Sequence, residues 1–294
     1  MRLRDLFLLA AICFIWALNL IVSRWLFADN GVPPIFYAAV RFVLVAALLS
    51  PLLRPLPKPL LPILTIGVLM GAIHFGLMFI ALANASSSSV SIVLQTAIPM
   101  TAAFSIFLLG ERVGLTRGLG IALALGGVVL VMWEGEGVGV SFGLVYAFLS
   151  AAAVALGSVL LKRYGAIRPL TMQAWIALVS APPLMAYALL FEPAPLETSL
   201  AAGWPFWAGL AFSVVLVTLV ATTLYFGVLQ RYPASIVAPL GLMMPLMAVA
   251  MGIVLLGESF DLRMAIGGVI ALVGLLLVLR QRPPREVVLP REMT

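Results

Sequence analysis

LLGE stands at Leu108–Glu111 and again at Leu255–Glu258, 147 residues later in a chain of 294. The similarity extends beyond these four letters, since residues 108–131 and 255–278 are identical at 11 of 24 aligned positions. The offset is half the length of the chain. We therefore expect one structural unit used twice.

Composition shows what kind of unit this is. Hydrophobic residues make up 64% of the chain, charged residues 10%, and the mean hydropathy is +1.20, which is more apolar than a soluble core requires. A helix needs about 20 mainly apolar residues to cross a bilayer. The sequence predicts an all-α membrane protein with ten spans at 6–27, 35–53, 60–83, 86–109, 115–133, 141–161, 170–191, 204–229, 234–256 and 264–280.

Basic residues set the orientation, because Lys and Arg of short loops stay in the cytoplasm. With the N-terminus inside, all of the 17 Lys and Arg residues except Arg24, Arg41 and Arg263 fall on the cytoplasmic side. Both termini are then cytoplasmic, in a bacterial-type inner membrane. The net charge of +6 thus reflects membrane topology and does not indicate a nucleic-acid surface.

Each half holds five spans, and five is odd, so the second copy starts from the opposite face of the membrane. We predict two inverted five-helix repeats, at 6–133 and 141–280, followed by a cytoplasmic tail at 281–294. Inverted repeats are typical of secondary transporters, whose substrate site lies near the midplane and is exposed to each side in turn. The alternative is that duplication only enlarged a helical bundle with another task.

Two longer stretches resemble a known family. They are ALANASSSSVSIVLQTAIPMTAAFSIFLLGERV (Ala81–Val113) and RYPASIVAPLGLMMPLMAVAMGIVLLGESF (Arg231–Phe260). With the ten spans, they resemble the EamA-type branch of the drug/metabolite transporter (DMT) superfamily, most closely its YddG-type amino-acid exporters. The resemblance implies export of amino acids and related metabolites.

Polar side chains within spans cost free energy in hydrocarbon, so they tend to face a partner or a wet cavity. Helical spacing places several of them, together with apolar neighbours, on shared faces. For Ser and Thr the alternative is a hydrogen bond between helices. The candidate substrate-binding residues are Trp16, Asn19, Arg41, His74, Met78, Gln95, Ser158, Tyr225 and Met243.

Two of these residues are ionisable, and each has two interpretations. Arg41 either snorkels to the outer surface or grips a substrate carboxylate. His74, the only histidine, is either a structural hydrogen-bonding group or a substrate or proton site. Since His74 and Cys13 are too few ligands for a metal, we expect no metal and no cofactor.

Other residues carry structural expectations. Pro99 and Pro245 each lack an amide hydrogen and are predicted to bend spans 4 and 9 as hinges. Glu111 and Glu258 precede spans 5 and 10, where a carboxylate favours a helix N-terminus. For close packing of span 5 we expect a stripe of small residues at Gly118, Ala122 and Gly126.

We predict an alternating-access exporter of neutral amino acids with apolar or aromatic side chains, with the lipid bilayer and small molecules as partners, no nucleic acid, and a monomer as the working unit. The alternatives are a multidrug or other-metabolite exporter of the same fold, a channel, and an intramembrane enzyme that pairs His74 with a serine of span 4. No Asp or Glu lies in the middle of a predicted span, which disfavours lipophilic cations as cargo.

Overall fold

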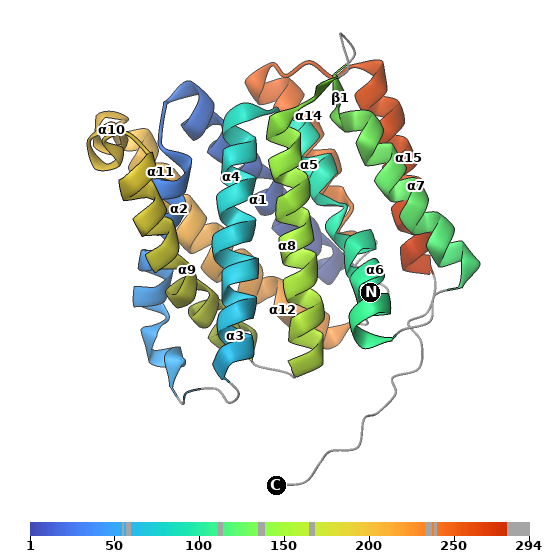
Figure 1. Cartoon of the computed structure of the whole chain (residues 1–294), viewed down its shortest axis with the longest axis horizontal. Coiled ribbons are helices and arrows are strands. Elements are labelled where there is room, and N and C mark those ends of the chain that lie inside the picture. Colours follow the sequence, from blue (N-terminus) through green and yellow to red (C-terminus); the bar gives the residue numbers. More distant parts are fainter. Residues whose placement is uncertain are drawn as a thin grey trace, which may run out of the picture.

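The computed structural model describes residues 1–54, 56, 60–110, 114–134, 139–164, 168–232, 237 and 240–280. Over these ranges the chain forms a bundle of helices that lie side by side (Figure 1). One short antiparallel ribbon pairs β1 (Trp133–Glu134) with β2 (Gly139–Val140). The predicted all-helical membrane architecture is confirmed in this coarse sense.

The helices of the first half follow the predicted spans closely. They are α1 (Leu3–Arg24) with the π-helical η1 (Trp25–Asp29), α2 (Pro34–Leu48) with the 3₁₀ turn η2 (Ser50–Leu53), α3 (Leu60–Gly67), the π-helical η3 (Val68–Ile73), α4 (His74–Asn84), α5 (Ser87–Leu94), α6 (Ala97–Leu109) and α7 (Leu115–Met132).

The second half contains a short helix, α10, that follows the predicted span 170–191. The described helices of this half are α8 (Phe142–Tyr164), α9 (Pro169–Phe191), α10 (Pro195–Ala201), α11 (Trp204–Ala211), the π-helical η4 (Phe212–Ala221), α12 (Thr222–Arg231), α14 (Met243–Leu256) and α15 (Leu262–Arg280).

Eight described helical segments are long and apolar enough to cross a membrane. Pro34–Leu48 and Met243–Leu256 are shorter apolar helices, at the places where spans 35–53 and 234–256 were predicted. The first of these ends early because its last predicted residues form the 3₁₀ turn η2. Part of residues 234–239 and the predicted tail 281–294 lie outside the described residues.

Predicted span 4 is broken rather than bent. Gln95 and Thr96 separate α5 from α6, and their amides bond three residues back, to Ile92 and Val93. Pro99 is the third residue of α6, and Pro245 is the third residue of α14. A proline in the first turn of a helix removes no intrahelical bond. The expected mid-helix bend is therefore wrong, and a hinge role for these prolines stays a prediction.

π-Helical turns interrupt one long helix in each half. η3 lies between α3 and α4, and η4 lies between α11 and α12. Shifting 68–73 by the sequence offset of 147 gives 215–220, which lies inside η4. π-Turns are rare and are frequent at functional sites, so these two regions bear on where the site lies.

The repeated LLGE letters mark two helix ends. Gly110 ends α6 and Gly257 ends α14, with φ angles of +67° and +65°. Glycine is favoured there because a side chain is strained in the left-handed region. Glu111 lies outside the described residues.

Helices α7 and α15 pack backbone against backbone. A Cβ added at Gly127 would lie 2.5 Å from the amide nitrogen of Ala271, and one added at Gly120 would lie 2.9 Å from the carbonyl oxygen of Gly274. The expected stripe is wrong, because Gly118 and Gly126 have no such neighbour within 4 Å. Helix periodicity could not decide which face of span 5 meets its partner.

Candidate functional site

A buried polar network joins the two halves of the chain. Ser213 Oγ of η4 donates to Asn19 Oδ1 of α1 at 2.9 Å, and the hydroxyls of Ser213 and Tyr37 are 2.8 Å apart. Tyr37, on α2, donates to the carbonyl oxygen of Gly209 at 2.7 Å. Of the predicted residues, Asn19 thus faces a partner inside the bundle.

Arg41 extends this network along α2. Its Nη2 donates to Thr218 Oγ1 at 2.9 Å, and Thr218 Oγ1 donates to the carbonyl oxygen of Ser213 at 2.8 Å. The guanidinium carbon lies 4.7 Å from the ring centroid of Phe75. Because the residue is only 2% exposed, it does not snorkel to the surface.

Two members of the network, Tyr37 and Ser213, were missed from the sequence. A signal for Tyr37 was present, since it precedes Arg41 by four residues and therefore shares its helix face. Ser213 and Thr218 are five residues apart, a spacing that points to different faces on an α-helix. The π-helical turn η4 brings them together.

An apolar group forms around α1, the helix that also carries Asn19. The rings of Trp16 and Tyr225 meet edge to face with centroids 5.0 Å apart. Met243 and Met244, at the start of α14, pack against the same cluster. The structure therefore brings together three of the predicted residues, Trp16, Tyr225 and Met243.

His74 pairs with a serine outside span 4, the span that the enzyme alternative required. Its Nδ1 lies 2.8 Å from Ser150 Oγ, and that serine is on α8 rather than span 4. Ser150 Oγ also lies 2.8 Å from the carbonyl oxygen of His74. In the described ranges no group of three His, Cys, Asp or Glu side chains is placed to hold a metal.

Two further predicted residues have local partners. Met78 is buried in the main apolar core. Ser158 Oγ donates to Val154 O of its own helix at 2.7 Å, so this hydroxyl is already paired. The structure does not bring Met78 or Ser158 into the polar network.

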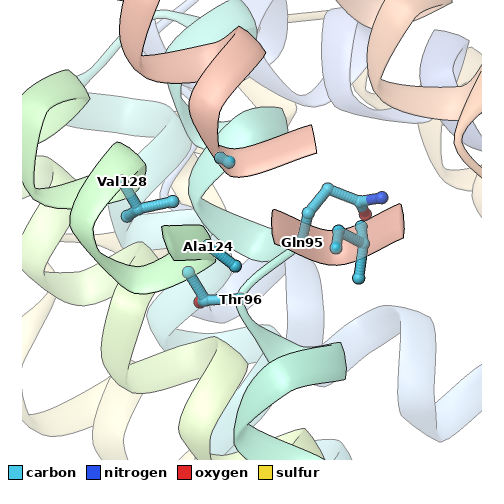
Figure 2. A pocket seen from close by; sticks show the side chains of 6 residues that line it. Gln95, Thr96, Ala124 and Val128 are labelled. Atoms are coloured by element: carbon cyan, nitrogen blue, oxygen red, sulfur yellow. The ribbon is translucent and has the colours of Figure 1, made fainter. Parts of the chain in front are cut away.

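Gln95 lines a small cavity at the break between α5 and α6 (Figure 2). The cavity has a volume of about 10 Å³, which is room for a single water molecule. Its walls come from the break and from α7 and α15. The lining residues are Gln95, Thr96, Ala124, Val128, Ala271 and Leu275.

Glu258 closes one end of the bundle, which we call the Glu258 end. Its carboxylate accepts hydrogen bonds from the amides of Ser87 and Ser88, at 2.6 and 3.0 Å, and from their hydroxyls, at 2.8 and 2.6 Å. The helix that it caps is α5 of the first half, not α15 as expected. Asp261 caps α15 instead, since its Oδ1 accepts from the amide of Met264 at 2.7 Å.

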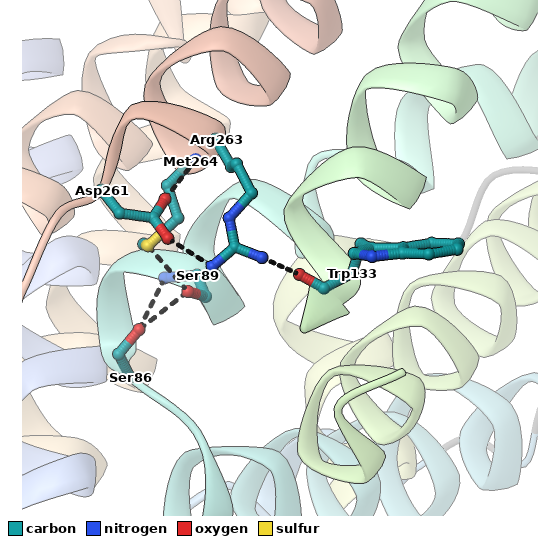
Figure 3. A network of polar contacts seen from close by, with 6 residues as sticks. All are labelled: Ser86, Ser89, Trp133, Asp261, Arg263 and Met264. Carbon is teal, nitrogen blue, oxygen red and sulfur yellow. Dashed lines mark hydrogen bonds and ion pairs between the residues drawn. The ribbon is translucent and has the colours of Figure 1, made fainter. Parts of the chain in front are cut away.

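Figure 3 shows polar contacts between the start of α5, at Ser86 and Ser89, and the start of α15, at Asp261, Arg263 and Met264. Arg263 donates to the carbonyl oxygen of Trp133 at 3.1 Å and pairs with Asp261 at 2.9 Å. Glu192, which follows α9, accepts from the amides of Ile35 and Phe36 at 2.8 Å each. Two carboxylates of the second half therefore cap helices of the first.

The opposite end, which we call the Asp5 end, is closed among the described residues by an ion pair and hydrogen bonds of side chains, together with the amide of Arg2, which donates to Tyr232 OH at 3.1 Å. Arg231 Nη1 lies 2.7 Å from Asp5 Oδ1, and Tyr232 OH donates to Asp5 Oδ2 at 2.8 Å. The side chain of Asp5 is 5% exposed and that of Arg231 is 54% exposed. These contacts also join the first half of the chain to the second.

Comparison with known proteins places the chain in a family. The model of the EamA-like transporter family matches residues 3–133 and again 141–280. A protein of Salmonella typhimurium named "Probable amino-acid metabolite efflux pump" is 29% identical over 94% of both chains, and one of the same name from Escherichia coli is 26% identical over the same shares. A solved structure with 20% identity superposes with a TM-score of 0.59 over 94% of this chain and 96% of its own. The family model covers nearly all of the chain, and the chain therefore belongs to the EamA-like transporter family.

Proposed function

We propose that this protein exports neutral amino acids with apolar or aromatic side chains, and related metabolites, by alternating access. The relatives named as amino-acid metabolite efflux pumps support the choice of cargo and direction. The observation that carries the proposal is the network of Asn19, Tyr37 and Ser213, because it is buried between the halves. Transporters of this kind bind cargo between their two halves.

The proposed architecture is a pair of inverted repeats, at 6–133 and 141–280. The glycine contacts support it, because Gly120 faces Gly274 and Gly127 faces Gly267. The offset of 147 turns the first contact into the second, as a twofold axis requires. The corresponding positions of η3 and η4 add support.

The proposed cargo site combines polar and apolar walls. Asn19 and Gln95 would meet the charged groups of a zwitterion, whose two charges partly compensate each other. Trp16, Tyr225 and Met243 would meet its side chain, since aromatic rings and thioethers adapt to varied shapes. The contacts at the Glu258 end and the Asp5 end would then open in turn.

We place both termini in the cytoplasm of a bacterial-type inner membrane, which makes the Glu258 end the outer one. The distribution of basic residues supports this orientation. Labelling of single introduced cysteines in a Cys13→Ala background tests it. Modification of a cysteine near the N-terminus by an impermeant reagent added outside would contradict the orientation.

Counterflow by the purified protein in liposomes, screened against the twenty amino acids, tests the function. We expect exchange of several neutral amino acids, and a loss of at least about tenfold in Asn19→Ala, because a buried hydrogen-bond partner is removed. Ser158→Ala is the control, since this hydroxyl bonds its own helix. Preferential exchange of a quaternary ammonium dye, without competition by amino acids, would favour the multidrug alternative.

The intramembrane enzyme is no longer an alternative. The family is one of transporters, and two relatives that are 29% and 26% identical carry efflux-pump names. The pair of His74 and Ser150 is explained as a hydrogen bond between α4 and α8.

A further inference from the structure

Arg24 and Arg41 both lie inside apolar helices of the bundle, and they differ in what surrounds the charge. Arg24 Nη1 donates to the carbonyl oxygens of Leu82 and Ala83 at 3.1 and 3.0 Å. These carbonyls belong to the last turn of α4, where the helix carries partial negative charge. Arg24 is therefore electrostatically compensated by the protein itself.

Arg41 has no such compensation. Its only hydrogen bond among the described residues goes to the neutral hydroxyl of Thr218. The Nε and Nη1 atoms are buried and have no hydrogen-bond partner. The described ion pairs, Arg231 with Asp5 and Arg263 with Asp261, do not involve it.

An uncompensated charge inside a membrane protein is costly, and such residues usually mark a pathway for substrate or ions. The ring of Phe75 and the hydroxyl of Thr218 offset only part of this cost, because neither carries a charge. A counter-charge that arrives with the cargo would remove the rest. The cost is then part of the transport cycle rather than a permanent loss of stability.

The guanidinium offers the right geometry for a carboxylate. Nη2 carries two hydrogens, so it can keep Thr218 and still complete a fork with either Nε or Nη1. Such forks match the two oxygens of a carboxylate. Arg41 also links the two halves of the chain, because it belongs to α2 of the first half and donates to Thr218 in η4 of the second half.

We infer that Arg41 binds the carboxylate of the transported amino acid and selects for cargo that carries this group. The inference rests on the export function proposed above. It assigns to Arg41 the discrimination between carboxylates and their uncharged or cationic derivatives. Asn19, Tyr37 and Ser213 extend the same polar surface from this anchor.

The test compares analogues of phenylalanine as competitors of its counterflow in liposomes. 3-Phenylpropionate keeps the carboxylate and lacks the amine, whereas phenylalaninamide keeps the amine and lacks the carboxylate. For the wild-type protein we expect 3-phenylpropionate to compete at least about tenfold better, the effect of a charge-assisted hydrogen bond. Equal competition, or better competition by the amide, would overturn the inference and leave the export function standing.

Variants separate a binding role from a structural one. In Arg41→Gln the half-saturation concentration for phenylalanine should rise by about tenfold, and the preference for 3-phenylpropionate over the amide should vanish. Arg41→Lys, which keeps the charge without the fork, should fall between. Arg24→Gln is the matched control and should keep the wild-type preference. An unchanged preference in Arg41→Gln contradicts the assignment.

A binding measurement separates this inference from the proposed function. If the wild-type protein exchanges no amino acid, export fails, but the thermal midpoint in detergent still reports on Arg41. If 3-phenylpropionate raises the thermal midpoint of the wild-type protein but not that of Arg41→Gln, a carboxylate site at Arg41 is supported. If the thermal midpoint rises with chloride and not with 3-phenylpropionate, the site at Arg41 binds an inorganic anion, and the inference is overturned.

Discussion

The two ends of the bundle are both closed by contacts between the halves, but the contacts differ in kind. At the Glu258 end, Glu258 and Glu192 bind backbone amides at the starts of α5 and α2. At the Asp5 end, one carboxylate binds the side chains of Arg231 and Tyr232.

This difference bears on which end opens more easily. Backbone amides at a helix start are fixed in direction and carry partial positive charge, so a carboxylate there is held firmly. A pair of side chains separates by rotation about single bonds, and water screens the exposed Arg231. We therefore expect the Asp5 end to open at a lower cost than the Glu258 end.

The largest effect is expected from Glu258→Gln. The change keeps the size of the side chain but removes the charge and weakens four hydrogen bonds, which should lower the free energy of unfolding by about 2–3 kcal/mol. A cysteine at Ser91, one turn deeper and fully buried, should react faster with a thiol reagent in a Cys13→Ala background. The exposed Glu197 supplies the control, since Glu197→Gln should change neither quantity. If Glu258→Gln behaves like this control, the cap does not close this end.

A smaller effect is expected from Arg231→Gln. The ion pair is half exposed on the Arg231 side, so its loss should cost about 1 kcal/mol or less. A cysteine at the buried Leu9, one turn from Asp5, should nevertheless become more reactive, because the ion pair joins the start of α1 to the end of α12. Arg263→Gln, at a pair that is 45% exposed on both sides, is the control and should leave Leu9→Cys unreactive. If Arg231→Gln destabilises the fold more than Glu258→Gln does, the Asp5 end is held more firmly than the Glu258 end, contrary to our expectation.

The half-buried Glu192 should make the stability of the fold depend on pH. Burial raises the pKa of this carboxyl above its ordinary value of 4.5, against the amides of Ile35 and Phe36, which lower it. A carboxyl whose pKa is higher in the folded state contributes stability at pH below its unfolded-state pKa. This contribution is lost as the pH rises through its folded-state pKa. Stability should therefore fall slightly, by less than about 1 kcal/mol, as pH increases from 4.5. The thermal midpoint of Glu192→Gln, measured as the pH increases from 4.5, should not show this decrease. If the midpoints of the variant and the wild-type protein change equally with pH, Glu192 is not the cause of the decrease.

The smallest effect is expected from Asp261, and it has the opposite sign. The amide of Met264, followed by Arg263, lowers the pKa of this carboxyl below 3.8. A carboxyl whose pKa is lower in the folded state contributes stability at pH above its unfolded-state pKa. This contribution is lost as the pH falls through its folded-state pKa. Because the side chain is 45% exposed, we expect less than about 0.5 kcal/mol. Asp261→Asn should flatten the acid limb below pH 3.8 in the same measurement, and a steeper limb would contradict the assignment.

Much of the candidate site was within reach of sequence reasoning. Trp16, Asn19 and Arg41 were singled out because polar or amphipathic side chains inside apolar spans need a reason to be there. Ser213 was out of reach, because the α-helical period of 3.6 residues separates it from Thr218. In the structure η4 packs against α1 and α2, and its own apolar sequence does not specify these partners.

The membrane class, the approximate spans and the repeated letters follow from the amino-acid order, because composition, run length and the offset of 147 are properties of the chain alone. The partners of individual side chains depend on how distant segments pack in space. Glu258 was expected at the start of the next helix in sequence, yet it caps α5, 170 residues away. A carboxylate binds the unpaired amides that come within its reach in space, and those were set by how the two halves pack.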